Sequence, residues 1–154
     1  MIIFTELPYP PSVNDSLAVF RGRMIKTAKA RAYKDQCQIF TAKNITALNQ
    51  ATTQIKSWLD QGLGIKVDCY FSLPEEKILT AGKKAIHRFK KSDVSNRVKL
   101  CHDALSDMLR IDDLYFIAGN AEKVIGPMGV TVYVTPHKLQ SLDEVKTQWI
   151  RKTE

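Results

Sequence analysis

Residues 64–73 read Gly-Ile-Lys-Val-Asp-Cys-Tyr-Phe-Ser-Leu, and an apolar side chain occupies every second position from Ile65 to Leu73. Successive side chains of a strand point to opposite faces, so this period of two predicts a strand with one face in the protein core. Glycines precede the stretch, and Pro74, which lacks an amide hydrogen and so ends a strand, follows it. This is the clearest strand in the sequence, and the other elements are expected to pack around it.

Three further strands are expected, one before and two after this stretch. The first covers residues 1–7 and ends at the proline-rich segment 8–12, where a loop begins that continues to about residue 23. The other two cover about residues 114–125 and 130–134, and the sequence Gly-Pro-Met-Gly at 126–129 separates them. A turn between two apolar runs predicts that the last two strands form a hairpin.

Two main helices are expected from apolar side chains at spacings of three and four. The first begins after Thr27, which serves as its N-cap, and reaches about Leu59 with a break near Asn49. The second is capped by Ser92, and its apolar stripe is formed by Val94, Val98, Cys101, Leu105 and Met108. Both helices therefore have one face that is expected to cover the sheet.

The remaining segments are expected to be peripheral. Residues 75–91 show neither period and are rich in basic side chains, which is typical of a long surface loop. Ser141 is expected to start a short C-terminal helix that turns Leu142, Val145 and Trp149 inward and leaves residues 151–154 frayed.

The composition favours one domain, covering residues 1–154, that binds a polyanion. The chain has 154 residues, a net charge of +7 and a pI near 9.4, which suit nucleic acid better than a membrane. Cys37, Cys69 and Cys101 form no CxxC pair, which predicts reduced core residues in a cytoplasmic protein. The histidine spacing does not match a zinc site, and neither an export signal nor a membrane span is expected.

Carboxylates and cations are concentrated around the second main helix. Asp93 is expected in its first turn, where the helix dipole favours an ionised carboxylate. Asp112 or Asp113, beyond its end, can supply a second ligand to Mg²⁺ if the next strand runs back beside the helix start. The segment before Asp93 adds cations that suit a phosphate backbone, namely Lys83, Lys84, His87, Arg88, Lys90 and Lys91. This composition indicates a nuclease-like metal site.

Lys99 lies on the polar face of the same helix, three residues after Asn96 and four before Asp103. Its ammonium is placed to pair with Asp103 or to stabilise charge on a phosphoryl oxygen. The alternative is a solvated helix face with an ordinary ion pair. Asp112-Asp113 has an alternative as well, a capped turn before a strand, and the basic segment 83–91 could be a solubilising insertion.

Three blocks of the sequence carry a family resemblance. The first is Leu-Pro-Tyr-Pro-Pro-Ser-Val-Asn at 7–14, with Arg-Gly-Arg at 21–23 and Ala-Tyr-Lys at 32–34. The second is His-Arg-Phe-Lys-Lys-Ser-Asp-Val-Ser-Asn-Arg-Val-Lys at 87–99, with Asp-Ala-Leu at 103–105, and the third is Ile-Asp-Asp at 111–113. In order and spacing they resemble the RusA-type Holliday junction resolvases, small dimeric endonucleases often carried by prophages.

The resemblance implies an α+β fold in which a mixed sheet of about four strands packs with the two main helices and the short C-terminal helix. It implies that Asp93 and Asp113 bind Mg²⁺ with Asp112 close by, that Mn²⁺ can substitute, and that Lys99 assists catalysis. Ser95, Asn96 and Asp103 would support the site. The phosphate contacts would come from Asn14, Arg21, Arg23 and the basic residues of segment 83–91.

A homodimer that nicks a four-way DNA junction at symmetric positions, in recombination and repair, follows from the same resemblance. Residues 137–154 are then a C-terminal extension of the RusA-like domain. Ser95 stands where the family has an aspartate, and a hydroxyl is a poorer ligand for Mg²⁺ than a carboxylate. The alternative is therefore a junction-binding protein that cuts weakly or not at all. A basic RNA-associated protein is a third reading, although the sequence shows no aromatic RNP-type motif.

Overall fold

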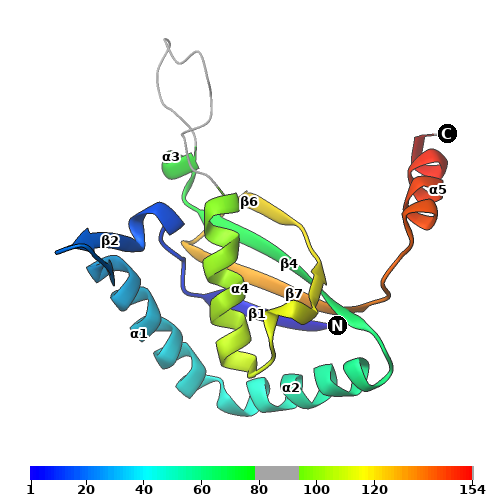
Figure 1. Cartoon of the computed structure of the whole chain (residues 1–154), viewed down its shortest axis with the longest axis horizontal. Helices are drawn as coiled ribbons and strands as arrows, with labels where there is room; N and C mark the ends of the chain where they lie inside the picture. The colour runs from blue at the N-terminus through cyan, green and yellow to red at the C-terminus, as the bar shows by residue number, and fades with distance from the viewer. Residues whose placement is uncertain (79–93, 154) are drawn as a thin grey trace, which may run out of the picture.

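A mixed sheet organises the protein. The computed structural model describes residues 1–78 and 94–153, and its strands form a five-stranded sheet with the order β1-β7-β4-β5, in which β6 also pairs with β4 (Figure 1). The strands are β1 (Ile2–Leu7), β4 (Gly64–Leu73), β5 (Phe116–Ala118), β6 (Ala121–Ile125) and β7 (Gly129–His137). β7 lies antiparallel to both β1 and β4, whereas β5 and β6 run parallel to β4. The predicted α+β class with a mixed sheet is confirmed.

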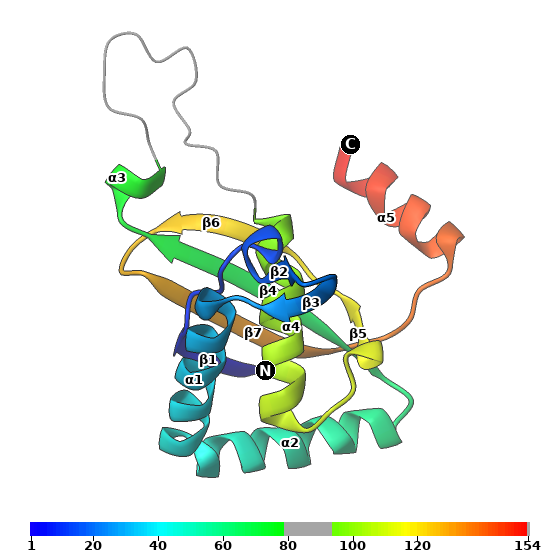
Figure 2. The ribbon, with the colours of Figure 1, turned by 60° about the vertical axis from the view of Figure 1, so that its left-hand side comes forward.

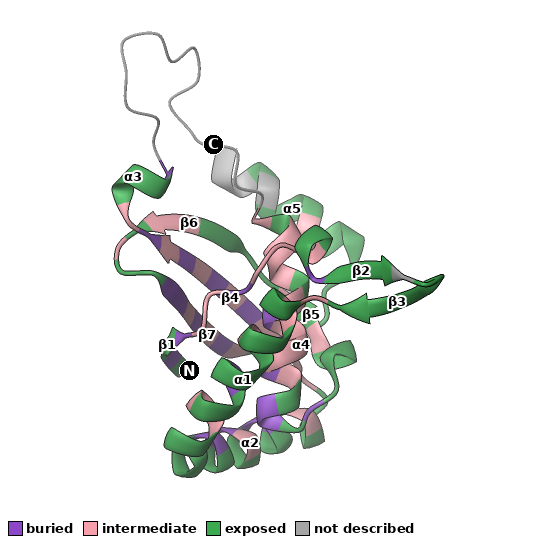
Figure 3. Cartoon of the chain, turned by 90° about the vertical axis from the view of Figure 1, so that its left-hand side faces the viewer, coloured by how far each residue is buried: buried purple, intermediate pink, exposed green. Residues whose placement is uncertain are grey.

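β4 is the strand that the alternating sequence predicts. Half-buried and buried residues alternate along all ten positions of β4, and Ile65, Cys69 and Phe71 are at most 1% exposed. The stripes along β4 in Figure 3 show this alternation, with buried positions facing the helices. On the other face Tyr70 and Tyr133 meet edge to face, with ring centroids 5.5 Å apart. The sheet therefore has one helix-covered face and one open face.

The first strand carries a bulge that explains its loose alternation. Phe4 and Leu7 are both buried although they are three positions apart, which a regular strand does not allow. The pairing of β1 with β7 shifts register between these two residues, and Glu6 adopts a φ of 60° within the irregularity. The bulge rotates the strand so that both side chains reach the core.

The first predicted helix is two helices. α1 (Ala28–Lys43) and α2 (Ile45–Asp60) meet at Asn44, five residues before the predicted break near Asn49. Asn44 has a φ of −116° and a ψ of 18°, and its side-chain amide donates to the carbonyl of Phe40 over 2.9 Å. The Asn44 side chain thus satisfies a carbonyl in the last turn of α1, and its backbone angles change the direction of the chain. α2 then crosses beneath the sheet (Figure 1). Thr27 is the N-cap of α1, as predicted.

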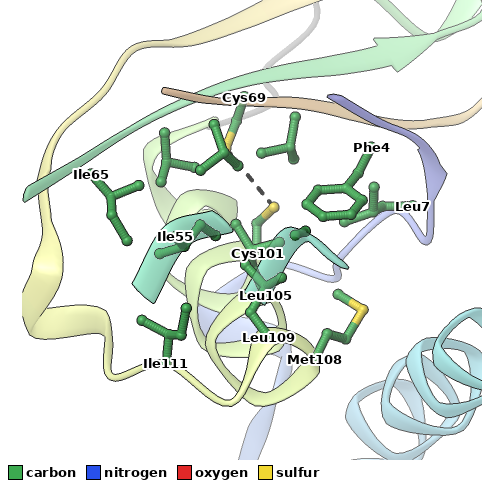
Figure 4. Packing of buried hydrophobic residues seen from close by; sticks show 14 of the residues in the cluster. Phe4, Leu7, Ile55, Ile65, Cys69, Cys101, Leu105, Met108, Leu109 and Ile111 are labelled. Atoms are coloured by element: carbon green, nitrogen blue, oxygen red, sulfur yellow. Dashed lines mark hydrogen bonds between the residues drawn. The ribbon is translucent and has the colours of Figure 1, made fainter. Parts of the chain in front are cut away.

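α4 (Ser95–Leu109) is the central helix and packs its apolar stripe on the sheet. Cys101, Leu105 and Leu109 are at most 1% exposed and contact side chains of β4, β7 and α2 in one cluster. Figure 4 shows this cluster, with Cys69 of β4 facing Cys101 of α4. All three cysteines are free and buried, which confirms that they are core residues.

β6 and β7 do not form the predicted hairpin, because β4 lies between them. The turn 126–128 crosses over the end of β4, where the amide of Gly126 donates to the carbonyl of Leu73 over 3.0 Å. The hydroxyl of Ser72 bonds to the carbonyls of Pro127 and Gly129 on the same turn. Three residues are enough to span the two strand spacings, about 9.6 Å, that separate β6 from β7.

The predicted strand over 114–125 is also interrupted. Asp113–Tyr115 forms a 3-10 turn, η2, and β5 and β6 are separated at Gly119 and Asn120. The backbone amide of Asn120 donates to the Asp68 carboxylate over 2.9 Å and not to a backbone carbonyl of a neighbouring strand. The backbone carbonyl of Asn120 accepts from the backbone amide of Cys69 over 2.8 Å. These two contacts hold the break against β4.

Two segments predicted to be loops contain short elements. Within the N-terminal loop, η1 (Val13–Asp15) leads into a hairpin of β2 (Leu17–Phe20) and β3 (Arg23–Lys26). The hairpin turn has φ of 49° at Arg21 and 73° at Gly22, the positive values that a two-residue type I′ turn requires. α3 (Glu75–Ile78) is a single turn after β4.

The C-terminal helix α5 (Leu142–Thr153) begins with the predicted cap. Ser141 and Glu144 form a reciprocal capping box, in which each side chain accepts from the other residue's amide. The predicted inward packing is wrong for Leu142, which is 69% exposed, and α5 stands apart from the sheet in Figures 1 and 2. Val145 is half-buried, and the side chain of Trp149 lies outside the described part of the structure. The helix continues to Thr153 where a frayed end was expected.

Candidate functional site

The polar face of α4 presents Lys99 and Asp103 beside the N-terminal part of the chain. The Lys99 ammonium lies 3.3 Å from a carboxylate oxygen of Asp103, and both side chains remain accessible. This is the contact expected from residues four apart on a helix. The pair would form with or without a role in catalysis, because it needs nothing beyond helical spacing.

A groove of about 630 Å³ runs beside this pair between α4, α1 and the η1–β2 segment. Its floor is largely apolar and includes Tyr33, Cys37 and Met108, whereas the charged residues at its edge are Lys26, Lys34, Lys99, Asp103 and Asp107. Burial raises the pKa of the Tyr33 hydroxyl far above its usual value, so this group stays neutral. Lys99 and Asp103 thus lie at the edge of a concave surface with cations on both sides.

Asp112 and Asp113 lie beyond the C-terminal end of α4. Asp112 accepts from the amide of Leu114 over 3.0 Å and so caps η2, and Asp113 is the first residue of that turn. Both are exposed. The structure therefore shows the capped turn that was the alternative for this pair, while leaving the carboxylate of Asp113 accessible to a ligand.

Val94, the residue that follows Asp93 in the sequence, lies at the opposite end of α4 from Asp113. The helix has 15 residues and is therefore about 22 Å long. η2 continues into β5 and β6, and β6 runs back toward the N-terminal end of α4 only after residue 120 (Figure 1). Asp112 and Asp113 do not lie beside the start of α4.

Several predicted site residues fall outside the described residues. These are Asp93 and the basic residues Lys83, Lys84, His87, Arg88, Lys90 and Lys91, whose roles stay predictions. The start of α4 is described, and there Ser95 is exposed and Asn96 is half-buried. Within the described residues no three potential metal ligands of the His, Cys, Asp and Glu types gather in one place.

The N-terminal candidates occupy two places. Asn14 is an exposed residue of η1, which packs against α4 and so lies next to the helix that carries Lys99. Arg21 and Arg23 lie at the turn of the β2–β3 hairpin, and both are exposed. Figure 3 shows this hairpin projecting from the helices on the side away from the sheet.

Arg97 is a residue near the site that the sequence did not single out. Its guanidinium lies over the ring of Tyr9, 5.0 Å from the centroid, and donates to the carbonyl of Pro10. It thereby fastens the proline-rich segment to the first turns of α4. The signal for this contact in the sequence was the proline-rich segment. Prolines have carbonyls but no amide hydrogens, so such a segment has more acceptors than donors and a side chain can supply the missing donor.

The buried thiols are structural. The sulfurs of Cys69 and Cys101 are 4.0 Å apart, and both residues are 1% exposed. The pKa of the Cys101 thiol is raised by its hydrogen bond with Cys69 and by burial. Because both thiols are buried in the core, a substrate has no access to them, and these residues contribute packing.

The structure thus combines exposed carboxylates after α4 with a groove whose edge carries three lysines and two aspartates. The family model for Endodeoxyribonuclease RusA matches residues 8–136, which covers β4, β5, β6 and nearly all of β7, the groove and the Asp112-Asp113 pair. The chain belongs to the RusA endodeoxyribonuclease family. This is a family of Holliday-junction-resolving endonucleases that act on branched DNA and in general depend on a divalent metal ion.

A sequence comparison with curated proteins finds no match. Across residues 1–78 and 94–153, every helix is too short or too polar to cross a bilayer.

Proposed function

We propose that this protein is a Mg²⁺-dependent endonuclease that resolves four-way DNA junctions by paired symmetric nicks in recombination and repair. The observation that carries the proposal is the family match over residues 8–136. The net charge of +7 and the exposed lysine of α4 support it, because a nuclease must hold a phosphate backbone and stabilise charge on the phosphoryl oxygens.

The carboxylates of the chain fit a magnesium ion. Mg²⁺ takes one or two protein carboxylates and completes its shell with water and substrate phosphate, so it does not require three protein ligands together. Asp113 and Asp112 offer exposed oxygens, and we propose Asp93 as the partner ligand. When bound, the ion would polarise the phosphodiester and favour its hydrolysis, and Mn²⁺ would substitute.

The length of α4 bears on how these ligands would meet. Two carboxylates on one Mg²⁺ lie within about 4 Å of each other, since each oxygen is about 2.1 Å from the ion. The ends of α4 are about 22 Å apart, and Asp113 lies beyond the end opposite to Val94. We therefore propose a homodimer in which Asp93 of one copy and Asp113 of the other share one ion, with two equivalent sites.

The other residues of the site would position the DNA and the developing charge. Asp103 orients Lys99 by the 3.3 Å ion pair, and the ammonium would stabilise a phosphoryl oxygen. Ser95 and Asn96, at the start of α4, would support the ligands there with a hydroxyl and an amide. Asn14, Arg21 and Arg23 would contact phosphates together with the basic segment 83–91.

A mixing experiment tests the shared site. Asp93→Asn and Asp113→Asn are each expected to abolish nicking of an oligonucleotide four-way junction in Mg²⁺. If each site uses both copies, mixing the two inactive variants gives about half heterodimers, each with one intact site, and single-strand nicking returns without paired nicking. Asp143→Asn, at an exposed aspartate of α5, is the control and should keep wild-type cleavage. A mixture that stays inactive would refute the sharing, and cleavage by Asp93→Asn alone would refute the assigned ligand.

Lys99 can be tested against a matched ion pair. Lys99→Met should retain junction binding but lose most of its nicking, because only the transition state gains from the ammonium. Lys146→Met removes a surface lysine that pairs with Asp143 in α5 and should leave nicking unchanged. Equal rates for the two variants would show that Lys99 is only part of a solvated helix face.

The second candidate function, a junction-binding protein that cuts weakly, is favoured by Ser95. Its hydroxyl is exposed at the first residue of α4, where a carboxylate would add a ligand for Mg²⁺. Ser95→Asp tests this function. Tight metal-independent binding without cleavage in the wild type, and a large gain of cleavage in Ser95→Asp, would establish binding as the activity of the natural chain.

A further inference from the structure

The β2–β3 hairpin exposes an unusual number of apolar side chains for so small an element. Leu17, Val19, Met24 and Ile25 are 45%, 71%, 63% and 41% exposed. Val19 and Met24 face each other across the two strands, one residue pair away from the turn, and share their face with Leu17, whereas Ile25 lies on the opposite face. An apolar patch of this kind, at the tip of an isolated two-stranded ribbon, indicates a contact surface, because it gains nothing for folding.

The hairpin is anchored firmly at its base. The Thr27 amide donates to the carbonyl of Ser16 over 3.0 Å, and the Thr27 hydroxyl donates to the carbonyl of Asp15 over 2.6 Å. Arg31 of α1 donates to the carbonyl of Lys26 over 2.8 Å. η1, at the same base, packs against α4, so the hairpin has a defined position relative to Lys99.

The charges of the β2–β3 hairpin indicate which kind of partner it contacts. Residues 17–26 carry Arg21, Arg23 and Lys26 and no carboxylate, and the two arginines flank Gly22 at the turn. A second copy of a chain with a net charge of +7 complements this tip poorly, whereas DNA complements both of its features. Phosphates suit the arginines, and the face of a base pair suits an aliphatic pair such as Val19 and Met24.

We propose that the β2–β3 hairpin inserts at the branch point of the DNA, where Arg21 and Arg23 contact phosphates and Val19 and Met24 pack against a base pair that the branch leaves unstacked. A four-way junction offers such a surface at its centre, and linear duplex does not. The hairpin would thus favour branched over linear DNA without reading sequence. This inference rests on the proposed junction-directed function.

The test is a double variant with a matched control. Val19→Thr with Met24→Gln keeps strand-compatible side chains but removes the apolar tip. Ile125→Thr with Met128→Gln makes a similar change at the end of β6 and in the turn that follows it, at residues that are 63% and 60% exposed. Binding is measured by fluorescence anisotropy without divalent metal, so that no cleavage occurs, on a four-way junction and on a linear duplex of equal length. A thermal melt of each variant confirms that it is folded.

The tip variant is expected to bind the junction about tenfold more weakly and the duplex within about twofold of wild type, since the lost contact is with an exposed base pair. The control variant should match wild type on both DNAs. A 2-aminopurine placed at the branch point should change its fluorescence on binding wild type and respond less to the tip variant.

Three results would overturn the inference. They are unchanged junction binding by the tip variant, an equal loss on junction and duplex, and a shift of its sedimentation from dimer to monomer, which would make the face an interface between copies. Failure of the proposed function is visible separately, because wild type would then show neither a preference for the junction nor cleavage in Mg²⁺.

Discussion

Among the glycines that the structure describes, Gly119 is expected to be the least replaceable, and Gly119→Ala is the perturbation that shows it. A Cβ at this position would overlap the carbonyl oxygen of Val67 in β4, so the β5–β6 break must move away from β4. That movement stretches two hydrogen bonds, Cys69 amide to Asn120 carbonyl at 2.8 Å and Asn120 amide to Asp68 carboxylate at 2.9 Å. A neutral bond contributes about 1 kcal/mol and a bond to a charged group about 2, so the expected loss is about 2 to 4 kcal/mol.

Urea unfolding followed by circular dichroism measures this loss as a shift of the midpoint at constant slope. Gly126→Ala is the control, because a Cβ there would meet only Ser72 Cβ at 3.5 Å, an ordinary contact. The control should change the free energy of unfolding by less than about 1 kcal/mol. If Gly119→Ala unfolds at the same urea concentration as Gly126→Ala, the close approach of the break to β4 does not constrain the protein and the reasoning fails.

Two further substitutions test the core and the end of α4. Leu105→Ala removes a side chain that is 0% exposed between α4 and the sheet and should lower the free energy of unfolding by about 2 to 5 kcal/mol in the same assay; a loss below about 1 kcal/mol would contradict its place in the core. Arg110→Gly should raise stability by about 0.5 to 1 kcal/mol, because Arg110 has a φ of 53° that glycine adopts without strain; destabilisation in differential scanning calorimetry would show that the arginine side chain matters more than its backbone.

Local patterns in the sequence were enough to predict the elements that form the core. The alternation over residues 64–73 predicted β4, and the spacing from Val98 to Met108 predicted the buried stripe of α4. The same reasoning could not order the strands. Gly126 and Pro127 indicate a turn, but whether the flanking strands pair or admit β4 between them depends on contacts far apart in the sequence.

Short elements were missed because their signals are weak. The β2–β3 hairpin has strands of four residues and an Arg-Gly turn in place of the stronger Asn-Gly or Asp-Gly signal, so a loop was the simpler interpretation. The junction at Asn44 was placed too late, since an asparagine within a polar helix surface looks the same whether or not it ends the helix. Only its backbone angles distinguish the two cases.

The spacing of residues along α4 was enough to predict one part of the candidate site, but not the rest. The pairing of Lys99 with Asp103 follows from a spacing of four residues, and the structure contains it. The relation of Asp113 to the start of α4 is not local, because it depends on where η2 and β5 lead the chain. The expectation that the chain doubles back beside the helix start is not met by Asp112 or Asp113, and the proposed homodimer is the arrangement that keeps these residues as ligands.

The sheet order also sets the sequence of events during synthesis. β1 pairs only with β7 in the described part of the sheet, and their partners range from Ile2 with Val134 to Leu7 with Val130. In the described sheet β1 therefore gains its partner only after β7 has been synthesised, and its edge needs protection meanwhile. A nascent chain stopped before residue 129 would lack β7, which joins β1 to β4, so the complete sheet is expected to form only after β7 has been synthesised.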